Sequence, residues 1–489
     1  MTDHAAPHHA APHQDGSHHA APHHDGPDPD TAHAWSALGG ADEPAAGIRY
    51  RPAPGTLPAR LPVRRLARAC VGVCSLAAAV LLAAGGGASS APDVLVDEDA
   101  VAAAFVSELR LRIDGRTPTV FAPLSGFWRT ADGWLRTHAN YPHHRARLLA
   151  ALDLPATGTD PGRLARELAG RSAVEVQEAV YAAGGLAVAV APPAPAAGHA
   201  ARHPLVELTR PVAGAGRALA PAALPAAGVR VLDLTRVIAG PVATRTLALL
   251  GADVLRIDSP RLPESPEAHA DTGFGKRSAC LDLALPADRA VLEELLGTAD
   301  VVVTGYRPAA LDAFGLGAGD LLRRHPGLVV AQLCAWGWSG EWAGRRGFDS
   351  LVQAARGIAV LEAGPDGAPG VLPAQALDHG TGYLLAAGVL RALTERQADG
   401  RGAHLRFSLA GTADWLLGMA SRRGGSGDSG DFGGSGPEAT AGPASERLGE
   451  TGSPYGQLRY ARPPLGYRGA PTDWASGPGR WGTDRPSWR

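Results

Sequence analysis

Lysine is almost absent from this chain of 489 residues, and cysteine, methionine and aromatic residues are also few. The four cysteines, Cys70, Cys74, Cys280 and Cys334, do not form the two closely spaced pairs that bind zinc, so we expect no metal site. So few cysteines favour a reduced, cytoplasmic protein over a disulfide-stabilised secreted one. The formal net charge of −2 argues against partners such as nucleic acid that are attracted by bulk charge.

Two stretches near the N-terminus lack the patterns of an ordinary folded domain. Residues 1–45 have no apolar periodicity but contain nine of the 18 histidines, which predicts a disordered, His-rich tail. Residues 70–88 have no charged side chain and are long enough to span a membrane. Because alanine and glycine dominate this run, we expect a buried helix of a soluble protein and no membrane association.

The rest of the chain divides by composition. We expect a small α/β unit over residues 46–208, a linker over 209–227 and the main domain over 228–420. A flexible Gly/Ser-rich linker over 421–445 and an extended C-terminal segment over 446–489 follow. The domain order is therefore small unit first and main domain second.

Residues 228–260 indicate the fold of the main domain. A β-rich run from Val229 to Leu234 is broken at Gly240 and Pro241, and a helix-like stretch then leads to a second apolar run that ends at Asp258. This is the pattern of a βαβ unit, and strands and helices continue to alternate after it. We therefore predict a doubly wound, parallel, Rossmann-like α/β sheet.

Three short motifs give little support to the functions that they usually indicate. Gly425–Gly430 satisfies GxGxxG, but no strand precedes it and it lies in low-complexity sequence. Gly337–Glu341 resembles the nucleophile elbow of serine hydrolases but lacks its final glycine. Asp258 ends the first βαβ unit as in dinucleotide-binding proteins, yet the turn has only Gly240, so a nicotinamide enzyme is a weaker alternative.

Five segments of the main domain, in this order, resemble the signatures of the class III CoA-transferases (CaiB/BaiF type): residues 233–260, 275–283, 299–317, 347–357 and 376–402. This family includes formyl-CoA and carnitine CoA-transferases and the related α-methylacyl-CoA racemases. Residues 128–190 also resemble the small domain of this family, which normally follows the catalytic core and here precedes it. The chain thus resembles a rearranged or partly duplicated member.

The resemblance places the catalytic aspartate of the family at Asp378. The residue also precedes a long apolar stretch, so its carboxylate should lie near the positive end of a helix, which favours the ionised form. Such a carboxylate can attack a thioester to form an acyl-aspartyl anhydride and CoA thiolate. From the residues alone, an ordinary helix N-cap is the alternative interpretation.

The resemblance also implies a site for coenzyme A, which would be a substrate and not a permanently bound cofactor. The residues that it implies are Val237, Ala239, Gly240, Pro241, Lys276, Arg277, Gly305, Tyr306 and Arg307. Cationic side chains suit the phosphates of CoA, and the tyrosine could stack on adenine. The alternative interpretation of Lys276 and Arg277 is a solvated strand end.

The expected function is therefore transfer of CoA between an acyl-CoA and a carboxylic acid, in a homodimer. Racemases of the superfamily carry a histidine where this chain has Phe348, and phenylalanine cannot move a proton, so a racemase is less favoured. His379 keeps that alternative open, although we expect a capping or surface histidine there, and we expect Asp349 to be structural. A non-catalytic acyl-CoA-binding protein is a further alternative.

Overall fold

A mostly parallel sheet forms the centre of the computed structural model, which describes residues 28–86, 93–193, 203–211, 213–214, 216–422 and 447–489. The sheet has the strand order β10-β9-β8-β11-β12-β13-β7. Its strands are β7 (Glu207–Thr209), β8 (Arg230–Leu234), β9 (Asp253–Asp258), β10 (Arg277–Cys280), β11 (Val301–Thr304), β12 (Val329–Cys334) and β13 (Ala403–Ser408). All neighbours pair in parallel except β13 and β7, which confirms the predicted parallel α/β core.

Helices cover both faces of this sheet because its central strands are apolar on both sides. Val231 and Val301 face α9 (Ala239–Leu249) and α15 (Ala376–Asp399), whereas Leu232 and Val302 belong to a second core with α11 (Pro286–Leu296) and α12 (Ala318–Arg324). The connection between β8 and α9 is shorter than predicted, because α9 begins at Ala239, two residues before Pro241. The strand order reverses beside β8, since β9 lies on one side of it and β11 on the other.

The N-terminal helices pack on the main domain and not on the small unit. They include α1 (Pro29–Ala37), α2 (Asp42–Ala46), α3 (Val63–Gly86), α4 (Glu98–Phe105) and α5 (Ser107–Arg110), with the parallel pair β1 (Ile48–Arg51) and β2 (Val94–Asp97). The prediction of a disordered tail is therefore wrong for its described part, where Asp28 caps α1 and Trp35 is buried. Residues 1–27 lie outside the described residues.

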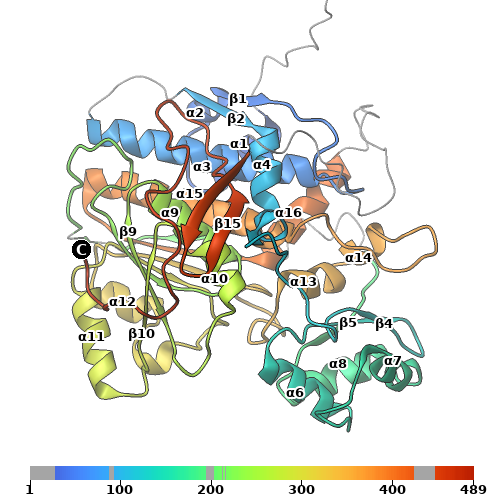
Figure 1. Cartoon of the computed structure of the whole chain (residues 1–489). Helices are drawn as coiled ribbons and strands as arrows, with labels where there is room; N and C mark the ends of the chain where they lie inside the picture. Colours follow the sequence, from blue (N-terminus) through green and yellow to red (C-terminus); the bar gives the residue numbers. More distant parts are fainter. Residues whose placement is uncertain (1–27, 87–92, 194–202, 212, 215, 423–446) are drawn as a thin grey trace, which may run out of the picture.

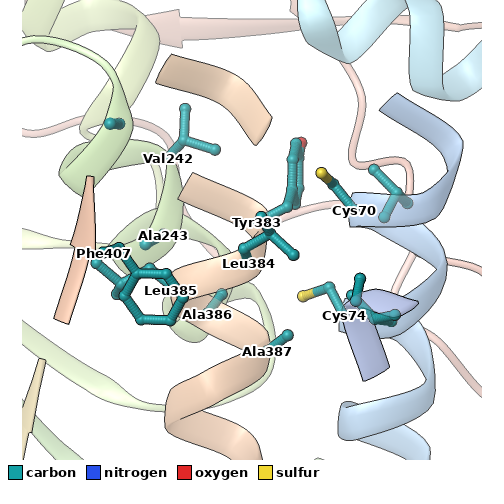
Figure 2. Packing of buried hydrophobic residues seen from close by; sticks show 14 of the residues in the cluster. Cys70, Cys74, Val242, Ala243, Tyr383, Leu384, Leu385, Ala386, Ala387 and Phe407 are labelled. Atoms are coloured by element: carbon teal, nitrogen blue, oxygen red, sulfur yellow. The ribbon is translucent and has the colours of Figure 1, made fainter. Parts of the chain in front are cut away.

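Helix α3 contains the apolar run, and it packs along α15, as Figure 2 shows for Cys70 and Cys74 opposite Tyr383 and Leu384. It is the one described helix that is long and apolar enough to cross a membrane. However, 78% of its most apolar window is buried inside the protein. Packing against α15 therefore accounts for the apolar composition of this helix.

A separate small unit lies at the lower right of Figure 1 and has its own core. It contains β4 (Phe127–Arg129), β5 (Trp134–Thr137), β6 (Ala187–Ala189), α6 (Pro142–Ala151), α7 (Pro161–Ala169) and α8 (Ala173–Ala182). The predicted unit over residues 46–208 is thus divided differently in the structure, because side chains from residues 48–82 and 94–106 belong to the core of the main domain. The predicted linker 209–227 follows β7, which joins the large sheet.

The remaining elements complete the body. They are β3 (Arg112–Ile113), α10 (Pro266–Thr272), the 3₁₀ helix Asp312–Phe314, α13 (Asp349–Ala355), α14 (Ile358–Leu361), α16 (Leu409–Arg422), β14 (Leu448–Ser453) and β15 (Gly456–Ala461). The C-terminal segment therefore forms a hairpin that pairs with β3, and its later part docks through indole hydrogen bonds from Trp474 and Trp481. The GxGxxG motif and residues 423–446 lie outside the described residues.

Candidate active site

Asp378 is the third residue of α15 and lines a cavity of about 460 Å³. The residue is only 6% exposed, so its carboxylate faces this cavity and not the bulk solvent. The cavity lies between the N-terminal helices, the small unit and the main domain, because Glu108, His138 and Val237 also line it. Asp378 is therefore placed where a small bound molecule could reach it.

Asp349 holds the first turn of α15 in place. One oxygen of its fully buried carboxylate, Oδ2, accepts hydrogen bonds from the backbone N–H groups of Leu377 (2.9 Å) and Asp378 (3.0 Å). Its Oδ1 accepts a hydrogen bond from Gln353. Because the first N–H groups of a helix have no partner within the helix, this carboxylate from α13 caps α15. That geometry agrees with the structural role expected for Asp349.

The environment of Asp378 differs from the sequence-based expectation. A helix start was expected to favour its ionised form, but burial, Asp349 and Glu108 raise the pKa of Asp378 well above its usual value. Burial likewise raises the pKa of Asp349 to about 6. The like charges and the loss of water therefore outweigh the helix terminus, and Asp378 ionises only at a higher pH than an exposed aspartate.

His379 was expected to be a capping or surface residue, and this is wrong. It is fully buried, its Nε2 lies 3.0 Å from Oε2 of Glu108, and its ring packs beside Phe105. The partner residue comes from α5, which sequence reasoning did not connect with the site. Only the fold brings Glu108, 270 positions earlier in the chain, to the helix of Asp378.

A histidine from the small unit packs on Phe348. The rings of His138 and Phe348 are stacked, with centroids 3.8 Å apart and planes 7° from parallel, and both residues line the cavity. Burial lowers the pKa of His138 to about 3, so its imidazole is neutral at physiological pH. Sequence reasoning missed His138, because no local motif marks it.

The turn between β8 and α9 contributes one wall of the cavity through Val237 and Ile238. Val237 has φ = 71°, a conformation that is unfavourable for a β-branched residue. Ala239, Gly240 and Pro241 follow as the buried first turn of α9 and do not line the cavity. Gly240 is required for packing, since a Cβ atom there would lie 2.3 Å from Cβ of Thr235.

Lys276, the only lysine of the chain, is buried and does not face any described cavity. Its ammonium contacts Asp233 (3.1 Å), Thr244 (2.5 Å) and the carbonyl oxygen of Pro241 (2.9 Å). Arg277 pairs with both carboxylate oxygens of Asp253. These contacts point to structural roles for both cations, because binding a phosphate would require them to leave their partners.

The last residues predicted to bind CoA, Gly305, Tyr306 and Arg307, lie near other cavities. Tyr306 and Arg307 line a cavity of about 440 Å³ near the carboxyl ends of β11, β12 and β13. Arg307 also lines a cavity of about 390 Å³ with Arg346. Burial and the charges of Arg307 and Arg147 lower the pKa of Arg346. Sequence reasoning missed Arg346 and Arg147.

The comparisons with known proteins concern the main domain. Residues 226–439 match CoA-transferase family III. Over 174 residues the chain is 36% identical to the probable fatty acyl-CoA transferase of Mycobacterium tuberculosis, covering 33% of this chain and 44% of that protein. It is 35% identical over 183 residues to the succinyl-CoA–L-malate CoA-transferase beta subunit of Chloroflexus aurantiacus, covering 35% of this chain and 45% of the relative.

A similar match is found with the formyl-CoA:oxalate CoA-transferase of Rhodopseudomonas palustris, at 33% identity over 175 residues, which covers 33% of this chain and 41% of that enzyme. A crystal structure of a hypothetical protein from M. tuberculosis shows 32% identity and a TM-score of 0.38, covering 41% of this chain and 60% of that one. The chain spans less than half the length of these three curated relatives.

Proposed function

Since residues 226–439 match CoA-transferase family III, we propose that this protein moves CoA between an acyl-CoA thioester and a carboxylic acid, with Asp378 as the nucleophile. The observation that supports this role is the position of Asp378, a carboxylate without an Arg or Lys partner among the described residues, at the wall of a cavity. Asp349 keeps that carboxylate at the start of α15.

The proposed reaction exchanges bonds at three carbonyl carbons, those of the donor acyl group, of Asp378 and of the acceptor acid. The carboxylate of Asp378 attacks the thioester carbonyl, the C–S bond breaks, and CoA leaves as the thiolate while an acyl-aspartyl anhydride forms. The thiolate then attacks the aspartyl carbonyl, which releases the first acid and leaves an aspartyl-CoA thioester. The carboxylate of the acceptor acid attacks this thioester, its C–S bond breaks, and a second acyl-aspartyl anhydride and free thiolate form. The thiolate then attacks the acceptor carbonyl of the anhydride, which gives the new acyl-CoA and releases the carboxylate of Asp378.

CoA would approach along the carboxyl edge of the Rossmann-like sheet, where such folds bind nucleotides. Arg307 and Arg346, which line the cavity of about 390 Å³, offer positive charge for its phosphates. The rings of Tyr141 and Phe348, 6.3 Å apart, line the Asp378 cavity. The pantetheine arm would pass beside them.

Replacing Asp378 with Ala tests the proposal. We expect the exchange of CoA between a thioester and a labelled acid to be abolished, while circular dichroism shows an intact fold. Hydroxylamine should trap an aspartyl adduct in the unchanged protein and none in the variant. Asp320→Asn is the control, since Asp320 is an exposed residue paired with Arg323. Exchange that persists in Asp378→Ala rejects the nucleophile, and CoA binding without any turnover indicates a non-catalytic binding protein.

One observation favours a second candidate, an acyl-CoA racemase or isomerase. His138 places a neutral imidazole against Phe348, in the same cavity as an aspartate whose pKa is raised. Such a base and acid could remove and return the α-proton of an acyl-CoA. Exchange of that proton with deuterium oxide, measured on a 2-methylacyl-CoA, would identify this activity. Loss of the exchange in His138→Ala would assign the base.

The remaining features implied by the resemblance belong to the same proposal. We propose a cytoplasmic homodimer that acts on acyl-CoA and carboxylic acid substrates, holds no permanently bound cofactor, and binds neither nucleic acid nor membrane. Light scattering of the purified protein measures its mass in solution, and fractionation of expressing cells shows where it is found. A monomer, or recovery only with membranes, would contradict the corresponding part.

A further inference from the structure

The walls of the Asp378 cavity are rich in apolar side chains. They include Leu111, Pro118, Val120, Phe121, Ala122, Val237, Ile238 and Phe348. Burying the methylene groups of a ligand against such surface is favourable, so a hydrocarbon chain would be stabilised here. Apolar walls alone do not select against charged ligands. Whether the cavity accepts a charged ligand depends on the charges of its lining residues.

The charged residues that line the cavity are all carboxylates. They are Glu108, Glu264, Glu267, Asp271 and Asp378, and neither lysine nor arginine is among the described lining residues. Two of them are neutralised from behind: Glu264 lies 3.0 Å from Arg256, and Asp271 lies 3.3 Å from Arg245. Both arginines are buried, and each is already engaged in an ion pair.

The other three carboxylates have different neighbours. Glu108 contacts His379, Glu267 accepts a hydrogen bond from Ser265, and Asp378 has Asp349 as its neighbour. No Arg or Lys pairs with any of the three in the described part of the chain. The cavity is therefore both apolar and negatively charged.

The nearest basic groups do not compensate for this charge. The guanidinium of Arg136 lies 5.2 Å from the ring centroid of Phe121, and that of Arg236 lies 5.4 Å from the ring centroid of Tyr141. Neither arginine is among the described lining residues. Arg236 also pairs with Glu264 (3.5 Å). His138, the one imidazole in the lining, is uncharged at neutral pH for the reason given above.

We propose that this cavity accepts the acyl chain of an uncharged, apolar monocarboxylic acid and rejects acyl chains that carry a second carboxylate. This inference rests on the proposed function and deepens it, because it names the substrate class. A distal carboxylate would be desolvated among like charges, with no cation to pair with, whereas a methyl terminus would contact only apolar walls.

Binding of two stable thioethers tests this selectivity without turnover. S-hexyl-CoA and S-(5-carboxypentyl)-CoA have chains of equal length and differ in ending with a methyl or a carboxylate group. By titration calorimetry we expect the carboxylate to raise Kd at least tenfold. Equal affinities, or tighter binding of the carboxylate, would overturn the inference while leaving the proposed CoA transfer intact. If neither thioether binds, the site assignment and this inference both fail.

Charge-removing variants test the cause. Glu267→Gln and Glu108→Gln should each reduce the ratio of the two Kd values by severalfold, because each removes one negative charge from the lining. Glu175→Gln, an exposed residue of α8 outside the cavity lining, should leave the ratio unchanged. A ratio that is the same in all three variants would show that charge does not determine selectivity.

Discussion

At the scale of single residues, the site is governed by three neighbouring carboxylates. Asp349 and Glu108 raise the pKa of Asp378, and Asp349 also holds its backbone. The same residue therefore places the nucleophile and delays its ionisation. Since only the ionised form can attack a thioester, the rate of the proposed reaction should depend on pH above the range in which exposed aspartates titrate.

Replacing Asp349 with Asn tests this coupling. The change removes one of the like charges, so the pKa of Asp378 should fall toward its ordinary value, and the rising limb of CoA exchange against pH should move to lower pH. The rate of CoA exchange between pH 4 and 9 measures this shift. The matched control, Asp312→Asn, changes an aspartate that lies outside the Asp378 cavity. A pH profile in Asp349→Asn that does not move would contradict the coupling.

The Lys276–Asp233 pair yields a second prediction at this scale. Lys276→Met leaves the buried carboxylate of Asp233 without its cation, so we expect the free energy of unfolding to fall by about 3–5 kcal/mol. Urea denaturation measures the change. If Lys276 instead bound a phosphate of CoA, the variant would keep its stability and lose CoA affinity.

Two further variants make this result interpretable. Arg261→Met breaks an exposed pair with Asp282 and should cost less than about 1 kcal/mol. The double variant Lys276→Met with Asp233→Asn removes both charges and should recover part of the lost stability. A single variant that is no less stable than Arg261→Met would contradict the structural role of Lys276.

At the scale of elements, α15 is positioned by α3. Both helices have 24 residues, and the two cysteines of α3 pack against α15 (Figure 2). Leu66 of α3 lies close to Gly380, because a Cβ atom at that glycine would be 3.7 Å from its Cδ2. The N-terminal helices therefore support the turn that carries Asp378, although they lie outside residues 226–439, the segment that matches CoA-transferase family III.

Leu66→Ala tests this support. The side chain is fully buried, so its truncation should lower the free energy of unfolding by about 2–5 kcal/mol and reduce CoA exchange through displacement of α15. Urea denaturation and the exchange assay measure the two effects. Leu285→Ala, at a position that is 51% exposed, is the control and should change little. A loss of stability in Leu66→Ala equal to that of the control would reject the packing argument.

At the scale of the whole molecule, the small unit precedes the main domain in the chain yet lies against it in space (Figure 1). Several side-chain contacts join them, and two of these are polar contacts at different places. The hydroxyl of Tyr141 donates to Glu264 (3.0 Å), and Arg345 pairs with Glu178 while its guanidinium packs on Tyr181. The unit has its own core, so it can remain folded when these contacts are weakened.

Arg345→Ala tests the docking of the small unit. We expect a loss of about 1–2 kcal/mol of interaction, and therefore a 5–30-fold faster amide hydrogen exchange in α8 at the docking face. Mass spectrometry of deuterated peptides measures it. Arg323→Ala, which breaks an exposed pair within α12, should not change exchange in α8. Unchanged exchange in Arg345→Ala would show that other contacts hold the unit.

Much of the fold was predictable, because its signals are local. Buried strands such as Val301–Thr304 are continuous apolar runs, and the turn at Gly240 separates the first strand from its helix. The carboxylate at the start of α15 was also found from the chain. The burial of His379 and the ends of the N-terminal tail and small unit were not predicted, since they depend on which segments pack together.

The sequence by itself determined the parallel α/β core, the family III segment and the position of Asp378 at a helix start, because each depends on neighbouring residues. Tertiary structure alone decided that Glu108, His138 and Asp378 share one cavity, since these residues come from three distant parts of the chain. It also decided the protonation of Asp378. A pKa depends on burial and on charges nearby in space, and the order of residues along the chain does not contain those distances.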